Sequence, residues 1–259
     1  MALLPLLKKR LGMSLFLPAH GRGRALPEEF KTLLRQRAGV WDLPELAEIG
    51  GPLETEGAVG QSQRDSASAM NADHCWYGVN GATGLLQAAL LAVAQPGEAV
   101  LMPRNVHKSL IQACVLGDIK PLLYNVPYQT KQGHSAPPNH AWIQKVLAEL
   151  PRNRGEIKAA VLVHPTYQGY ANDPTEIIAT LQEQGLSVLV DEAHGSHLAA
   201  AIDPDLPPSS LHCGADLVVH SLHKSAAGLA QTAVLWHQGQ RVDPERVERC
   251  LGWIQTTSP

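Results

Sequence analysis

Six short, mainly apolar runs recur between residues 99 and 236, and helical-period stretches alternate with several of them. The runs are AVLM, PLLY, AAVLV, SVLV, DLVV and TAVLW, at residues 99–102, 121–124, 159–163, 187–190, 216–219 and 232–236. The helical stretches lie at 83–94, 107–116, 141–150 and 174–184. In these runs apolar and polar residues do not alternate, which is typical of strands buried on both faces. Such strands occur in a mostly parallel sheet with helices packed on both faces. The pattern predicts an α/β fold of the doubly wound type.

The composition is that of a globular protein, because 44% of the 259 residues are hydrophobic and the formal net charge is −3. No block of Lys and Arg indicates a nucleic acid or a membrane surface as partner. The opening MALLPLLKKR has a very short apolar run with its charges after it, unlike a signal peptide, and no stretch is long enough for a membrane span. Cys75, Cys114, Cys213 and Cys250 lie far apart, which is typical of reduced thiols. We expect a cytoplasmic protein.

The N-terminal part differs from the rest of the chain. It is loop-rich, with a turn signal in PAHGRG at residues 18–23 and a short helical stretch at 28–37, whereas the regular pattern begins near residue 75. We therefore expect an N-terminal segment at residues 1–40 and one major domain at residues 41–259. The Pro- and Gly-rich breaks at 129–138 and 203–210 are predicted to be surface loops within that domain.

Three of the apolar runs end in clusters of polar residues: HPTYQG, DEAHGSH and HSLHKS. Open α/β sheets bind their ligands beyond the carboxyl ends of the strands, so these clusters predict a site. Their side chains capable of acid–base or nucleophilic chemistry are His164, Asp191, His194, Ser221, His223 and Lys224.

A fourth element is NGATG at residues 80–84, which opens the helical stretch TGLLQAALLAV. Gly81 offers a free backbone amide, Thr83 adds a hydroxyl, and a helix N-terminus attracts an anion. Taken alone, Asn-Gly before a helix is equally a plain turn with a cap. Together with Asp191 and Lys224 at other strand ends, it favours a phosphate group.

This combination meets the requirements of pyridoxal 5'-phosphate (PLP). A lysine amine forms a Schiff base with the cofactor aldehyde, and an aspartate keeps the pyridine nitrogen protonated. Asp191 and Ala193 point to the same side of a strand, and alanine is small enough for a flat ring to lie against it.

Five segments strengthen this interpretation: GVNGATG, LMPRNVHKS, PTYQGY, VLVDEAHGSH and GADLVVHSLHKS. In this order they resemble the ornithine/lysine/arginine decarboxylase family, of the aspartate-aminotransferase fold type, and the resemblance runs from PAHGRG to the final QTTSP. It implies the large domain of a PLP-dependent transferase-like (fold type I) enzyme. It further implies decarboxylation of arginine, lysine or ornithine to a polyamine-type amine and CO2. A homodimer or higher homo-oligomer is implied as well, because sites in this family borrow residues from a second subunit.

The resemblance gives catalytic roles to Lys224, His107 and Asp191. Lys224 would carry the cofactor, Asp191 would pair with the pyridine nitrogen, and His107 would stack on the ring face opposite Ala193. The full cofactor-binding set that it implies is Gly81, Ala82, Thr83, His107, Asp191, Ala193, His194, Ser221, His223 and Lys224.

Two departures from the family pattern stand out. The family often has a hydroxyl residue where this chain has Ala82, so one phosphate contact is expected from the backbone alone. PAHGRG lacks the first glycine and the lysine of the family's PGHKxG segment, which leaves the role of residues 18–23 open.

Other interpretations remain open. The same residues serve other fold-type-I PLP enzymes, such as an aminotransferase or a carbon–carbon lyase. The chain stops at Pro259, where the family continues into a C-terminal domain, so it is expected to be a fragment or a truncated, non-catalytic remnant. His107 and His164 are also compatible with core or loop histidines. No metal site is expected, because the metal candidates lack zinc-site spacing; they are His194, His197, His212, Cys213 and His220.

Overall fold

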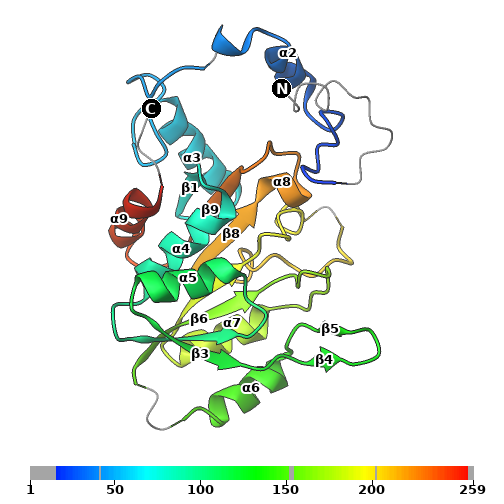
Figure 1. Cartoon of the computed structure of the whole chain (residues 1–259), viewed down its shortest axis with the longest axis vertical. Coiled ribbons are helices and arrows are strands. Elements are labelled where there is room, and N and C mark those ends of the chain that lie inside the picture. Colours follow the sequence, from blue (N-terminus) through cyan, green and yellow to red (C-terminus); the bar gives the residue numbers. More distant parts are fainter. Residues whose placement is uncertain (1–15, 41, 152–154, 202, 256–259) are drawn as a thin grey trace, which may run out of the picture.

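The structure, a computed structural model, describes residues 16–40, 42–151, 155–201 and 203–255. The MALLPLLKKR opening and the last four residues lie outside these ranges. Seven strands form one sheet in the order β1-β9-β8-β7-β6-β2-β3 (Figure 1). The strands are β1 (His74–Gly78), β2 (Ala99–Pro103), β3 (Lys120–Tyr124), β6 (Ile157–Val163), β7 (Ser187–Asp191), β8 (Leu217–Ser221) and β9 (Ala233–His237).

Strands β3, β2, β6, β7 and β8 are mutually parallel, and β9 runs antiparallel to both β8 and β1. This sheet confirms the predicted, mostly parallel α/β architecture. Each of the six apolar runs forms a strand, and β1 is an edge strand that the sequence did not predict.

The sheet carries two apolar cores, one on each face. Val100 and Met102 of β2 belong to one core, and Leu101 between them belongs to the other. Successive side chains of a strand point to opposite faces, so a strand between two cores must be apolar throughout.

Different helices cover the two faces. The first core includes α4 (Gly81–Val93), α5 (Lys108–Leu116) and α9 (Pro244–Ile254), and the second includes α3 (Gly57–Ala69), α6 (His140–Ala148) and α7 (Thr175–Glu183). Helix α4 is the most buried of them, since Leu85, Ala88, Ala89 and Leu90 are fully inaccessible to solvent. Of these helices, α3 and α9 were not predicted.

The start of α7 is held by a side chain that precedes the helix. The Asp173 carboxylate accepts hydrogen bonds from Thr175 N at 2.9 Å and from Thr175 Oγ1 at 2.6 Å. The helix begins at Thr175, one residue later than predicted, and Asp173 satisfies a free amide of the first turn.

The remaining elements are short. Helix α2 (Glu28–Leu34) ends before the predicted residue 37, and η1 is a turn of 3-10 helix (Ala38–Val40). The break at 129–138 contains a small hairpin of β4 (Tyr128–Gln129) and β5 (His134–Ser135) at the periphery (Figure 1). Helix α8 (Leu222–Ser225) follows β8 directly. Within the described ranges, no helix is both long enough and apolar enough to cross a membrane.

The N-terminal segment reaches back to the strand ends. Ala19 N donates a hydrogen bond to His223 O at 2.8 Å, which places PAHGRG beside α8. The division into residues 1–40 and 41–259 stays a prediction.

Candidate active site

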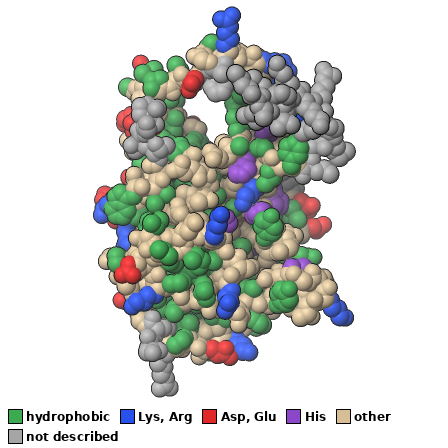
Figure 2. All heavy atoms as spheres, viewed as in Figure 1, with side chains coloured by type: hydrophobic (Ala, Val, Ile, Leu, Met, Phe, Trp, Pro, Cys, Tyr) green, Lys and Arg blue, Asp and Glu red, His purple; other side chains and the backbone are tan. Residues whose placement is uncertain are grey.

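A cleft of about 610 Å³ lies at the carboxyl ends of β2, β6, β7 and β8. Figure 2 shows histidine side chains and Lys or Arg side chains gathered near α8, where this cleft lies. The cleft is lined by Asn80, Gly81, Ala82, Thr83, Leu86, Asn105, Val106, His107, Lys108, Val163, Pro165, Tyr167, Asp191, Ala193, His194, Ser221, His223, Lys224 and Gln231. The fold thus brings every residue of the predicted cofactor-binding set into one cleft, although their roles stay predictions.

Asp191 ends β7 at the floor of the cleft, and only 7% of the residue is exposed. Its Oδ1 accepts a hydrogen bond from Ala193 N at 3.2 Å. Burial raises the pKa of Asp191, while that hydrogen bond and the charges of Lys224 and His107 oppose the rise. A buried carboxylate that faces a cleft is suited to a cationic partner with a hydrogen to donate.

Lys224 is half-buried and lies in α8, which follows β8 directly. Its Nζ lies 3.1 Å from His194 Nε2. Burial lowers the pKa of Lys224, and the nearby Asp191 charge opposes that effect. A lowered pKa increases the fraction of free amine, which is the form that attacks a carbonyl group.

His194 is the direct neighbour of this lysine. Burial, and then the positive charges of Lys224, His107 and His223, lower the pKa of His194 to about 4. The ring is therefore neutral at pH 7, and its Nε2 can accept a hydrogen bond from Lys224 Nζ. The exposed ring of Tyr167 packs edge-on against His194, with centroids 5.3 Å apart.

The opposite end of the cleft is the start of α4. Gly81 has φ = +65°, a left-handed conformation that favours glycine, and this turn points the chain into the helix. The first amides of a helix have no intrahelical partner, so those of Gly81, Ala82 and Thr83 are available to an anion. Ser221 Oγ and His223 Nδ1, which lie 3.2 Å apart, also line the cleft.

His107 lies at the N-cap of α5, and its side chain borders the cleft. Its Nδ1 accepts a hydrogen bond from Ser109 N at 3.3 Å and lies 2.8 Å from Ser109 Oγ. These contacts fix the orientation of an otherwise exposed ring.

His164 does not join the cleft. It is buried, with Nε2 3.1 Å from Pro208 O, and burial lowers its pKa.

Of the metal candidates, His220 forms hydrogen bonds with Glu192 and Trp236. Within the described part of the chain, no group of three or more potential ligands is arranged to hold a metal ion.

The sequence analysis missed a buried network directly behind the cleft. Glu192 is fully buried, and its carboxylate accepts hydrogen bonds from Ser210 N at 2.8 Å, from His220 Nε2 at 3.0 Å and from Ser209 Oγ. Trp236 Nε1 can only donate, and it donates to His220 Nδ1 at 2.9 Å. The proton of a neutral His220 must therefore lie on Nε2, where it faces the Glu192 carboxylate.

Sequence reasoning also left out of the predicted set five polar or aromatic residues of the lining: Asn80, Asn105, Lys108, Tyr167 and Gln231. Asn80, Asn105, Lys108 and Tyr167 lie inside the quoted segments GVNGATG, LMPRNVHKS and PTYQGY, so their position in these segments was the available signal. Gln231 precedes the β9 run and carried no signal.

Comparisons with known proteins agree with this geometry. The model of the family described as "Orn/Lys/Arg decarboxylase, major domain" matches residues 9–259. Arginine decarboxylase of Bacillus anthracis is 30% identical over 250 residues, which cover 96% of this chain and 50% of that protein. Arginine decarboxylase of Bacillus subtilis is 31% identical over 242 residues, covering 93% and 48% of the two chains.

The fold agrees as well. The structure of the E. coli constitutive lysine decarboxylase superposes with a TM-score of 0.72 at 20% identity, over 100% of this chain and 38% of that one. The predicted PLP-dependent transferase-like (fold type I) architecture is confirmed. The chain spans about half the length of the curated relatives that it matches. With its fold and nearly its whole length matched, the chain belongs to the Orn/Lys/Arg decarboxylase family, as a major domain of that family.

Proposed function

We propose that this chain is the PLP-binding major domain of a decarboxylase that converts a basic amino acid to the corresponding amine and CO2. One observation carries the proposal: Lys224, Asp191 and the first turn of α4 line a single cleft in a member of this family. Arginine is the first substrate to test, because the relatives at 30% and 31% identity are named arginine decarboxylases. Lysine and ornithine follow from the family description.

The residues of the cleft fit PLP. Asp191 is a buried carboxylate that faces the cleft, as the protonated pyridine nitrogen requires. Lys224 provides an amine with a lowered pKa for the cofactor aldehyde. The phosphate has two groups of donors available: the free amides of residues 81–83, and the Ser221 and His223 side chains.

The other lining residues would position the ring. His107, held by Ser109, would lie against one face, and the small Ala193 against the other. PLP supplies an electron sink, which stabilises the electron pair left behind when a carboxylate leaves. Asp191 would maintain the positive charge on which that stabilisation depends. Neutral His194, with Nε2 3.1 Å from Lys224 Nζ, would accept a hydrogen bond from the lysine and so orient its amine.

The proposal extends to the cellular setting. The product amine would place the protein in polyamine biosynthesis. All four cysteines are free, as is usual in the reducing cytoplasm. A homodimer or higher homo-oligomer is expected from the family, and residues of a second subunit would then complete the cleft.

The first experiment tests whether the chain binds PLP through Lys224. The purified chain is titrated with PLP, followed by absorption spectroscopy, borohydride reduction and peptide mass mapping. We expect a visible absorption band and a reduced adduct on Lys224, both lost in Lys224→Ala. Lys131→Ala, at an exposed lysine in the β4–β5 turn, is the matched control and should retain both. Binding that persists in Lys224→Ala at an unchanged level would overturn the assignment.

The second experiment identifies the reaction. Arginine, lysine and ornithine are incubated with the PLP-loaded protein, and CO2 and amine are measured. Release of both in equal amounts supports a decarboxylase. A keto acid or an aldehyde would instead assign an aminotransferase or a carbon–carbon lyase. Binding of PLP without any product would assign a non-catalytic remnant.

A further inference from the structure

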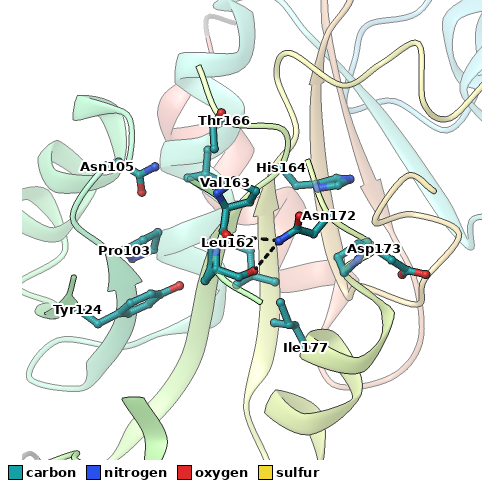
Figure 3. A pocket seen from close by; sticks show the side chains of 13 residues that line it. Pro103, Asn105, Tyr124, Leu162, Val163, His164, Thr166, Asn172, Asp173 and Ile177 are labelled. Carbon is teal, nitrogen blue, oxygen red and sulfur yellow. Dashed lines mark hydrogen bonds between the residues drawn. The ribbon is translucent and has the colours of Figure 1, made fainter. Parts of the chain in front are cut away.

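A small second cavity lies beside the cleft, at the carboxyl ends of β2, β3 and β6 (Figure 3). Its volume is about 30 Å³. The Pro137–Pro138 segment borders it, and Asn172 Nδ2 donates to the carbonyl oxygens of both prolines, at 3.3 and 3.4 Å. Asn105 and Val163 line both this cavity and the cleft, so the two spaces are neighbours.

Two polar atoms of the cavity wall have no hydrogen-bond partner among the described residues: the Tyr124 hydroxyl and Asn105 Oδ1. Tyr124 is 7% exposed, and burial raises its pKa well above the usual range, so the hydroxyl keeps its proton. In Figure 3 both side chains border the cavity, on either side of Pro103. An unpaired buried polar atom is costly, and a native fold rarely retains two of them in the wall of one cavity.

Water fits this cavity in size and in chemistry. A buried water molecule needs a cavity volume of about 10–15 Å³ and two or more polar partners. The cavity volume of about 30 Å³ is therefore enough for roughly two water molecules. Asn105 Oδ1 can only accept a hydrogen bond, whereas the Tyr124 hydroxyl can donate or accept. A water between them would donate to the amide oxygen and pair with the hydroxyl, which satisfies both atoms.

We propose that this cavity is a buried-water site and that its water makes Asn105 a positioning residue of the cleft. Water on Oδ1 fixes the orientation of the Asn105 amide, which leaves its Nδ2 hydrogens for an acceptor oxygen in the cleft. Asn105 lies two residues before His107, in the turn that follows β2. Arg104 N donates to Tyr124 O at 3.0 Å, so the backbone already joins the same two segments. The part of the inference that concerns ligand binding rests on the proposed function, whereas the water site does not.

The water site is tested first, by high-resolution crystallography of the cofactor-free chain. We expect ordered water density within hydrogen-bond distance of Tyr124 OH and Asn105 Oδ1, and its weakening or loss in Tyr124→Phe. A dry cavity in the parent would overturn the proposal. This result does not depend on whether the chain binds PLP.

The positioning role is tested by a double-mutant cycle on PLP affinity. Tyr124→Phe and Asn105→Ala should each raise the Kd for PLP by about threefold to tenfold, the value of one hydrogen bond. Because both changes break the same bridge, the double variant should be no weaker than the worse single variant. Tyr77→Phe is the matched control: its hydroxyl bonds Ser62 and Ser66, away from the cleft, and its Kd should not change.

The outcomes separate the two proposals. Unchanged Kd values in both single variants, or effects that multiply in the double variant, would overturn the positioning role of Asn105. A parent chain that shows no Lys224-dependent binding of PLP would instead refute the proposed function, while the crystallographic result would still decide the water site.

Discussion

Replacing Glu192 by glutamine tests the buried network behind the cleft with almost no change in shape. The carboxylate receives hydrogen bonds from three donors: Ser209 Oγ, Ser210 N and His220 Nε2. A glutamine amide has one oxygen, so one of these donors must face the NH2 group in either orientation of the side chain. The variant therefore loses at least one charge-assisted hydrogen bond and leaves a buried donor without an acceptor.

The magnitude follows from that count. A hydrogen bond to a charged group contributes about 1.5–3 kcal/mol, and an unsatisfied buried donor costs about 1–3 kcal/mol. The two costs partly describe the same lost interaction, so they cannot simply be added. We therefore expect Glu192→Gln to lower the free energy of unfolding by about 3 kcal/mol. For a chain of this size, this corresponds to a fall in Tm of about 6–12 °C.

The change also has a pH dependence with a definite sign. Burial alone would raise the pKa of Glu192, but the hydrogen bonds from His220 and Ser209 lower it below its usual 4.5. A carboxyl group with a lowered pKa in the folded state stabilises the fold above pH 4.5, and this contribution is lost as the pH falls. The difference between parent and variant should therefore be largest near pH 7 and shrink in acid.

The assay is urea unfolding followed by circular dichroism, with the free energy extrapolated to water. The control is Glu183→Gln, an exposed residue of α7, which should change stability by less than about 0.5 kcal/mol. If Glu192→Gln is as stable as this control at pH 7, the reasoning is refuted, because Glu192 is then not an ionised acceptor of three hydrogen bonds.

Three further predictions test the cofactor site, the core and the thiols. Asp191→Asn should raise the Kd for PLP by about tenfold to a hundredfold in spectroscopic titrations, because an amide does not offset the charge of a protonated ring nitrogen; an unchanged Kd would remove Asp191 from the site. Leu90→Ala should cost about 3–5 kcal/mol in urea unfolding, since Leu90 is fully buried in α4, whereas Leu116→Ala, at a 65% exposed position, should cost below about 1 kcal/mol. Burial raises the pKa of Cys75 to about 12 and of Cys114 to about 11, so neither should react with an aromatic disulfide reagent at pH 8 until urea unfolds the chain; rapid labelling of the folded protein would contradict their burial.

The strands were predictable because two apolar cores impose a simple pattern. Val188 and Val190 face one core and Leu189 faces the other, so β7 had to be apolar at every position. Strand β1 was not predicted because it is an edge strand. Its sequence, HCWYG, is not continuously apolar, and His74 is exposed. Helix α3 escaped for a related reason: its sequence GAVGQSQRDSASA buries only Gly60, Gln63 and Ala67, and so lacks an apolar stripe.

The site was predictable as far as it depends on strand ends. Asp191 is the last residue of β7 and Lys224 follows β8; the two strands are parallel neighbours, so their carboxyl ends lie at the same end of the sheet. The Tyr124–Asn105 cavity was not predictable, because it depends on how the turn after β2, the end of β3 and a proline segment meet in space. Glu192 was overlooked because its side chain points away from the cleft, opposite to Asp191, into contacts with residues 17 to 28 positions further along the chain.

The charged residues of the cleft indicate which groups of the proposed cofactor and substrate this lining can bind. Among the described residues that line it, Lys108 and Lys224 are basic, and Asp191 is the only acid. The basic groups suit a phosphate and a carboxylate, and the Asp191 carboxylate would be needed by the cofactor ring. The side-chain cation of arginine, lysine or ornithine therefore finds no carboxylate of its own in this lining. These residues therefore suit the proposed cofactor and the chemistry at the α-carbon, and we expect the choice among the three amino acids to depend on acidic groups beyond this described lining.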